Sequence, residues 1–230
     1  YLPSKYFNVQ RANLRIQALL IPSSSSQTIF VGTNIGVYRS QNLGATWKQI
    51  NQGLFDQNIR ALSLHPDFPK IIYAGTALGI FKSEDEGETW NEWIDESSGL
   101  TQPKVHGLSI DSQDSDILFA ATEGGVFKSL DGGESWDVLY DETPVLQIEF
   151  SSINPKIIYA VTARNIIRSN DGGNNWKSVW QNDVTNPLSI LALNTEPEFL
   201  YSGTQKGLLK SFNSGRNWVI DPNFSGIPVT

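Results

Sequence analysis

Short apolar runs recur along the chain in groups of four, and none has the 3.6-residue period of an amphipathic helix. Each group begins with a nearly continuous apolar run. These runs are LRIQALLIP (14–22), IRALSLHP (59–66), VHGLSIDS (105–112), VLQIEFSS (145–152) and LSILALNT (188–195). Such runs, with small residues among branched ones, are typical of strands buried on both faces. We therefore predict one buried strand at the start of each of five units.

Two further strands with a tight turn between them follow in every unit. The segments are TIFVGTNIGVYRS (28–40), IIYAGTALGIFKS (71–83), ILFAATEGGVFKS (117–129), IIYAVTARNIIRS (157–169) and FLYSGTQKGLLKS (199–211). Each has two β-branched and aromatic runs around Thr-x-x-Gly or a variant of it, which predicts a hairpin. A fourth short run starts at a Trp in each unit. The pattern thus predicts four antiparallel strands per unit.

An octapeptide separates the third predicted strand from the fourth in all five units. Its copies are SQNLGATW (40–47), SEDEGETW (83–90), SLDGGESW (129–136), SNDGGNNW (169–176) and SFNSGRNW (211–218). Four-stranded units repeated every 40 to 46 residues predict an all-β fold, a β-propeller of five four-stranded antiparallel blades. One blade cannot bury both of its faces alone, so its neighbours must cover them.

We expect one domain over residues 1–230. Its blades are predicted at about 14–56, 57–100, 104–142, 144–184 and 186–222. Residues 1–13 resemble the end of a preceding blade and are expected to fasten a closed ring by pairing with the last blade. Alternatively they are the stump of a larger propeller. The chain has no Met, even at position 1, so we expect that the gene product began upstream of Tyr1.

The octapeptide resembles the Asp-box, or BNR repeat, S/T-x-D/N-x-G-x-S/T/N-W/F. That resemblance covers nearly the whole chain and implies a propeller in which each box is the turn between the third and fourth strands. The structural Asp-box residues would be Ser40, Asn42, Gly44, Trp47, Ser83, Asp85, Gly87, Trp90, Ser129, Asp131, Gly133, Trp136, Ser169, Asp171, Gly173, Trp176, Ser211, Asn213, Gly215 and Trp218. The Asp or Asn can accept backbone N–H bonds, the Gly can adopt a positive φ, and the Trp can be buried between blades.

A calcium site is the alternative role for these acidic turns. The EF-hand spacing is absent, and two of the five copies carry Asn in place of Asp. Hydrogen bonding tolerates that exchange better than ligation of a hard cation does, so we expect no metal and no cofactor. A Lys or Arg precedes every octapeptide, and we expect its charged head to lie in water.

The net charge of −7 argues against nucleic acid and anionic membranes as partners. No stretch approaches 18 apolar residues, so no membrane span is expected. There is no cysteine, and redox chemistry therefore says nothing about the compartment.

A functional surface is expected on the rim opposite the octapeptides, where hairpin turns and inter-blade linkers gather. Its candidate binding residues are Asp56, Asp95, Glu96, Asp141, Glu142, Asp183, Arg164 and Lys206. The excess of acids favours a basic partner segment, whereas merely solvated loops are the plainer interpretation. Candidate aromatic contacts are Trp93, Tyr140 and Trp180, for which packing between blades is the commoner role.

No catalytic residue is assigned. The arginine triad of Asp-box sialidases has no counterpart on the rim, and an acidic face would repel an anionic sugar. The sequence is similar in character to photosystem II stability/assembly factors and to sortilin-type domains, which implies a non-enzymatic protein- or peptide-binding scaffold outside the cytoplasm (secreted, periplasmic or lumenal). The alternative is a glycoside hydrolase or carbohydrate-binding propeller for a neutral glycan, which would need two rim carboxylates about 5–10 Å apart.

Overall fold

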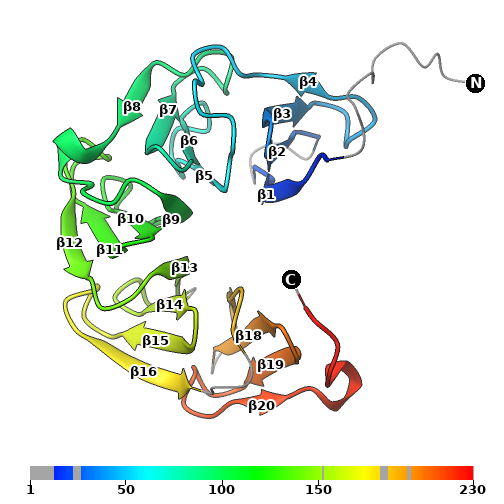
Figure 1. Cartoon of the computed structure of the whole chain (residues 1–230), viewed down its shortest axis with the longest axis vertical. Helices are drawn as coiled ribbons and strands as arrows, with labels where there is room; N and C mark the ends of the chain where they lie inside the picture. Colours follow the sequence, from blue (N-terminus) through cyan, green and yellow to red (C-terminus); the bar gives the residue numbers. More distant parts are fainter. Residues whose placement is uncertain (1–12, 23–26, 152, 182–185, 196–197, 230) are drawn as a thin grey trace, which may run out of the picture.

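The computed structural model describes residues 13–22, 27–151, 153–181, 186–195 and 198–229. Their strands form five separate four-stranded antiparallel sheets, which are the blades of a β-propeller arranged about a central axis (Figure 1). In each sheet the four strands are consecutive in the chain and lie side by side in chain order. The predicted fold class is therefore confirmed.

In each blade the first strand lies nearest the centre of the molecule and the fourth lies outermost (Figure 1). Blade 1 contains β1 (Ile16–Leu20), β2 (Ile29–Thr33), β3 (Gly36–Ser40) and β4 (Lys48–Gln49). Blade 2 contains β5 (Ala61–Leu64), β6 (Ile72–Gly75), β7 (Ile80–Ser83) and β8 (Glu92–Ile94). Blade 3 contains β9 (Val105–Ile110), β10 (Leu118–Thr122), β11 (Gly125–Ser129) and β12 (Asp137–Tyr140). Blade 4 contains β13 (Val145–Phe150), β14 (Ile158–Thr162), β15 (Asn165–Ser169) and β16 (Trp176–Gln181). Blade 5 contains β17 (Leu191–Leu193), β18 (Phe199–Thr204), β19 (Gly207–Ser211) and β20 (Val219–Ile220).

Two short 3-10 helices lie in linkers: η1 (Glu96–Ser98) after blade 2 and η2 (Pro222–Phe224) after blade 5. Within the described residues, no helix is long and apolar enough to cross a bilayer.

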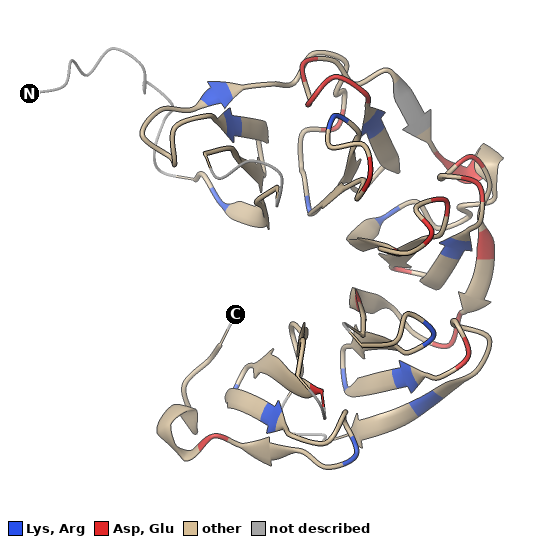
Figure 2. Cartoon of the chain, turned by 180° about the vertical axis from the view of Figure 1, so that it is seen from behind, with Lys and Arg blue, Asp and Glu red and all other residues tan. Residues whose placement is uncertain are grey.

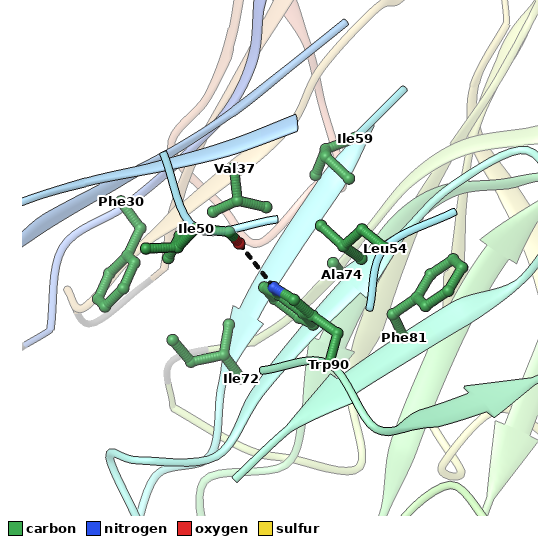
Figure 3. Close-up of a cluster of buried hydrophobic side chains, with 9 residues drawn as sticks. All are labelled: Phe30, Val37, Ile50, Leu54, Ile59, Ile72, Ala74, Phe81 and Trp90. Atoms are coloured by element: carbon green, nitrogen blue, oxygen red, sulfur yellow. Dashed lines mark hydrogen bonds between the residues drawn. The ribbon is translucent and has the colours of Figure 1, made fainter. Parts of the chain in front are cut away.

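The hydrophobic core lies between blades rather than inside one of them. Within the described residues, four buried clusters each join two consecutive blades, from blades 1 and 2 to blades 4 and 5. Figure 3 shows the first, in which Phe30 and Val37 of blade 1 meet Ile72, Phe81 and Trp90 of blade 2. Neighbouring blades therefore supply the burial that a single sheet lacks.

The five octapeptides form turns with the same hydrogen bonds. In every copy the Ser hydroxyl donates to the Asp or Asn Oδ1 at 2.7–3.0 Å and accepts the Gly N–H at 2.8–2.9 Å. The same Oδ1 accepts the N–H of the seventh residue at 2.8–2.9 Å. Asn42 and Asn213 make these bonds as Asp does, so the turn requires an oxygen acceptor and not a negative charge.

The bonds of the turn lower the pKa of the Asp171 carboxyl to about 2, first through the Asn175 side chain and then through its backbone N–H. Within the described residues no group of three or more His, Asp or Glu side chains is placed to hold a metal ion.

The cations that precede the octapeptides correct one expectation, because two of them bond across to the next blade. Arg39 is only 7% exposed, and its guanidinium donates to the Glu86 carbonyl at 3.1 Å and to the Glu88 carboxylate at 2.5 Å. Lys128 donates in the same way to the Gly172 carbonyl at 3.3 Å. The turn of the following blade presents oxygen acceptors at this point, and these bonds link adjacent blades.

The innermost strands also differ from prediction at one end of the molecule. The side chains of Ile16 and Leu19 on β1 are 66% and 63% exposed, whereas Val105 on β9 is fully buried. No described blade precedes blade 1, so its inner strand lacks a neighbour on that side. Closure of the ring by residues 1–13 stays a prediction, since residues 1–12 lie outside the described residues.

Candidate functional site

The two faces of the propeller carry different loops. The octapeptide turns share one face with the loops between the first and second strands, to which they bond through contacts such as Glu86 N to Lys70 O at 2.9 Å. The opposite face, here called the linker face, carries the hairpin turns between second and third strands and the linkers between blades. Figure 2 shows acidic residues mainly in loops and connections and several cations on strands.

The hairpin turns of the linker face are held by a buried threonine. Each Thr hydroxyl donates to the carbonyl of the residue three positions later, as in Thr33 to Gly36 at 2.8 Å and Thr204 to Gly207 at 2.7 Å. This bond fixes the short turns around the axis. Arg164 and Lys206, two of the predicted rim residues, lie exposed in the turns of blades 4 and 5.

The predicted acids of the linker face divide into structural and exposed groups. Asp56 accepts the N–H groups of Asn58 and Ala77 at 3.0 and 3.1 Å, which ties a linker to the hairpin of blade 2. Asp95 caps η1 through the Ser97 N–H at 2.8 Å. Both carboxylates therefore help to shape the face through bonds within the chain.

The remaining predicted acids point to solvent or are not described. Glu96, Asp141 and Glu142 are exposed. Asp183 lies outside the described residues. The exposed acids are the ones still available to a partner.

Two of the three predicted aromatic contacts are placed, and both pack inside the protein. Tyr140 is half-buried, with its ring centroid 6.2 Å from that of Trp176. Burial, followed by the nearby Glu142 carboxylate, raises the pKa of the Tyr140 phenol. Trp180 packs against the cluster between blades 4 and 5. The side chain of Trp93 lies outside the described residues.

All five blades meet at a cavity of about 340 Å³ on the axis, which we call the hub cavity. Its polar lining residues are Gln17, Arg60, His106, Gln147, Glu149 and Ser189. A cavity of this size, with a few convergent polar groups, has the character of a small binding site.

A chain of hydrogen bonds leads from the hub cavity to the linker face. Its members are Arg60, His106, Glu123 and Lys104. Arg60 Nη1 lies 3.2 Å from His106 Nδ1, and His106 Nε2 lies 2.9 Å from Glu123 Oε2. An arginine can only donate, so Nδ1 must accept and the neutral ring must donate from Nε2 to Glu123. Lys104 Nζ approaches the same Glu123 oxygen at 2.9 Å.

The pKa shifts agree with this arrangement. Burial lowers the pKa of His106, which keeps the imidazole neutral, although the hydrogen bond that its Nε2 donates to Glu123 acts in the opposite direction. The bonds from His106 and then Lys104 lower the pKa of the Glu123 carboxyl. The Arg60 Nε atom is buried and has no hydrogen-bond partner among the residues that the structure describes.

Glu149 is the second titratable group of the hub cavity. Burial raises its pKa to about 7, with Glu198 adding a smaller increase and a bond from the Ala192 backbone opposing it. The nearby Gln147 side chain both donates to and accepts from the Ile190 backbone, at 3.1 and 2.8 Å, so it links blade 4 to blade 5.

The residues of the hub cavity were not singled out from the sequence. The available signal was a polar residue within an otherwise apolar first-strand run, at Arg60, His106, Gln147 and Glu149. Those runs were interpreted as wholly buried strands, yet in a propeller one edge of each first strand faces the axis.

Several solved structures are similar to this chain. The GH74 enzyme of Niastella koreensis is 22% identical with a TM-score of 0.75, over 93% of this chain and 38% of its own. The extracellular domain of a B. thetaiotaomicron two-component system is 13% identical with a TM-score of 0.73, over 95% of this chain and 29% of its own. YCF48 from Cyanidioschyzon merolae is 17% identical with a TM-score of 0.62, over 87% of this chain and 71% of its own.

A second YCF48 structure contains a bound D1 peptide and matches with a TM-score of 0.50 at 14% identity, over 94% of this chain and 84% of its own. No protein-family model and no curated protein matches the sequence. The chain spans less than two fifths of the GH74 chains it resembles. At these identities the likeness establishes the fold and leaves the activity open.

Proposed function

We propose that the chain is a non-enzymatic scaffold that binds a protein or peptide segment at the hub cavity and the surrounding linker face. The observation that carries this proposal is the convergence of all five blades on one cavity with donors and acceptors of both charges. Arg60, which lines this cavity, can donate a bond to a carbonyl or carboxylate, and the Glu149 carboxyl offers one to an amide or amine.

The exposed acids Glu96, Asp141 and Glu142 favour a partner segment that carries Lys or Arg. The fold shared with YCF48, which was solved with a D1 peptide, is in line with a peptide partner. The five octapeptide turns, with their repeated bonds, support membership of the Asp-box propellers. An extracytoplasmic location belongs to the same proposal and is supported by the fold shared with an extracellular sensor domain.

A peptide array of extended and basic sequences tests the proposal. Retained peptides are titrated by fluorescence anisotropy against the native chain, Arg60→Ala and Glu149→Ala. We expect each substitution to weaken binding at least about tenfold, because each removes a hydrogen-bonding group from a desolvated site. Lys177→Ala, on the exposed outer strand β16, is the matched control and should bind normally. Unchanged affinity in both hub variants would place the binding site elsewhere.

A glycoside hydrolase is the second candidate, favoured by one specific observation. A carboxyl with a pKa of about 7 can act as a general acid at neutral pH, and Glu149 has that property at the hub cavity. The mechanism also needs a second carboxylate within about 5–10 Å of Glu149. Reducing-sugar assays on neutral polysaccharides decide the matter. Turnover that Glu149→Gln abolishes would establish an enzyme.

A further inference from the structure

The segment after blade 5 resembles the linkers that lead from blade 1 to blade 2 and from blade 2 to blade 3. Each begins with an isoleucine at the end of the outermost strand and continues to a glycine of positive φ and then an apolar residue. The isoleucines are Ile50, Ile94 and Ile220, the glycines are Gly53, Gly99 and Gly226, and the apolar residues are Leu54, Leu100 and Ile227. The three glycines have φ values of +96°, +96° and +81°.

The apolar residues of the first two linkers are buried by the blade that follows. Leu54 and Leu100 are 5% and 0% exposed, and each belongs to a cluster with the next blade's octapeptide tryptophan, Trp90 or Trp136. Ile227 is 54% exposed. The same contrast separates Ile50, at 2%, from Ile220, at 42%. Trp90 even donates its indole N–H to the Ile50 carbonyl at 2.9 Å (Figure 3).

The surroundings of Gly53, Gly99 and Gly226 show which contact the last linker lacks. A Cβ placed on Gly53 would overlap the Trp90 carbonyl, and one on Gly99 would overlap the Trp136 carbonyl. The residues before these glycines accept the tryptophan N–H groups at 2.9 and 2.8 Å. A Cβ on Gly226 meets nothing within 4 Å. This linker therefore has the conformation that receives a tryptophan backbone, without the tryptophan.

Val229 continues the comparison into the next strand. Its N–H donates to the Thr204 carbonyl at 2.8 Å, as the N–H groups of Ile59 and Val105 donate to Thr33 and Thr76 at 2.9 and 2.8 Å. Val105 is the first residue of β9, the innermost strand of its blade. Val229 thus occupies the position at which an innermost strand begins.

We propose that this tail surface, made by Ile220, Ser225, Gly226 and Ile227, is the docking face for a sixth blade. The occupant is a four-stranded sheet entered directly from Val229 in the same polypeptide, with a tryptophan before its outermost strand. That tryptophan donates its backbone N–H to Ser225 and packs over Ile220 and Ile227. The interface continues the four already present between consecutive blades.

A second copy of the chain fits the surface less well. Blade 1 does present an incompletely covered octapeptide, since a Cβ on Gly44 meets only Trp47, whereas one on Gly87 meets Ile50 of the preceding blade. In Figure 1, however, the C-terminal end of the chain lies at the opening between blades 1 and 5, so a blade that continues the same polypeptide reaches the tail surface without a second molecule. A blade that starts at Val229 enters this opening.

The test extends the full chain after Val229 with a copy of residues 106–142, which follow Val105 in blade 3. Ile227→Ala is introduced into the extended and the 230-residue chains, and Tm is measured for all four. We expect Ile227→Ala to lower Tm of the extended chain by about 4 °C or more, because it leaves a cavity in the new interface. The shift in the 230-residue chain should be under about 1 °C, as for an exposed side chain.

Leu130→Ala, at an exposed site remote from the tail, should shift Tm equally in both chains. Changing the Trp136 of the appended copy to Ala should remove the extra effect of Ile227→Ala. Equal Ile227→Ala shifts in both chains would overturn the proposal.

Two further measurements separate other occupants. Sedimentation should show the 230-residue chain as a monomer. The refuting result is an oligomer of this chain that both Ile227→Ala and Trp47→Ala abolish. Such an oligomer would assign the tail surface to a second copy and overturn the proposal. In the other refuting outcome, Ile227→Ala lowers Tm of the 230-residue chain by several degrees, and that shift is lost when residues 1–12 are deleted. This result would assign the tail surface to residues 1–12 and overturn the proposal.

Discussion

Glu149 offers a direct test of the electrostatics of the hub cavity. Its pKa of about 7, against 4.5 for an ordinary glutamate, means that the folded protein holds a proton there that the unfolded chain releases. Stability is therefore highest below pH 4.5 as far as this group is concerned, and falls as the pH rises from 4.5 to about 7. Above that window the buried charge lowers the free energy of unfolding by about 3 kcal/mol.

Glu149→Gln removes the charge and keeps an oxygen that can accept the bond from the Ala192 backbone. We expect the variant to be more stable than the native chain by about 2–3 kcal/mol at pH 8, and nearly equal to it at pH 4. For a chain of this size the gain corresponds to a rise in Tm of roughly 4–12 °C.

The assay is thermal unfolding followed by circular dichroism at half-unit intervals from pH 4 to pH 8.5. Glu134→Gln, at an exposed position of the third octapeptide, carries the same change of charge and should give no pH-dependent difference. A Glu149→Gln effect that is the same at pH 4 and pH 8 would refute the reasoning. So would a Glu149 carboxyl that titrates near 4.5 by carbon NMR.

Four other outcomes follow from the contacts. Asp131→Ala should cost about 1–2 kcal/mol in denaturant unfolding, whereas Asp131→Asn should cost under about 0.5, because Asn42 and Asn213 make the same bonds. Arg39→Met should cost about 1–3 kcal/mol, against none for exposed Lys177→Met, since it removes charged bonds between blades 1 and 2. Trp90→Ala should cost about 3–5 kcal/mol, and a value near that of an exposed residue would contradict its burial between blades. Nitrogen NMR should show His106 as the neutral Nε2–H tautomer at pH 6.5; because burial lowers its pKa below 6.5, its contribution to stability should be lost as the pH falls below that value.

The architecture was accessible from the sequence because its signals are local and repeated. The octapeptide, the Thr-x-x-Gly hairpin and the apolar first strand each report on residues that contact their own blade. Five copies of one pattern predict four strands per unit, and each predicted hairpin is present.

The hub cavity was not accessible in the same way because its residues come from different blades. Arg60 and His106 are 46 residues apart and meet only because consecutive inner strands converge on the axis. Equally, the sequence placed the head of Arg39 in water, since nothing local indicates that the next blade supplies the Glu88 carboxylate. Contacts between units depend on how the units are arranged, which periodicity does not report.

Among the described residues, each blade is built from four strands that are consecutive in the chain. A pulling force applied at the two ends of the described segment would therefore act first on blades 1 and 5. Each blade could detach as a unit while the rest of the arc keeps its shape. Force spectroscopy on such a chain should record a series of separate rupture events, one per blade, in place of one collective break.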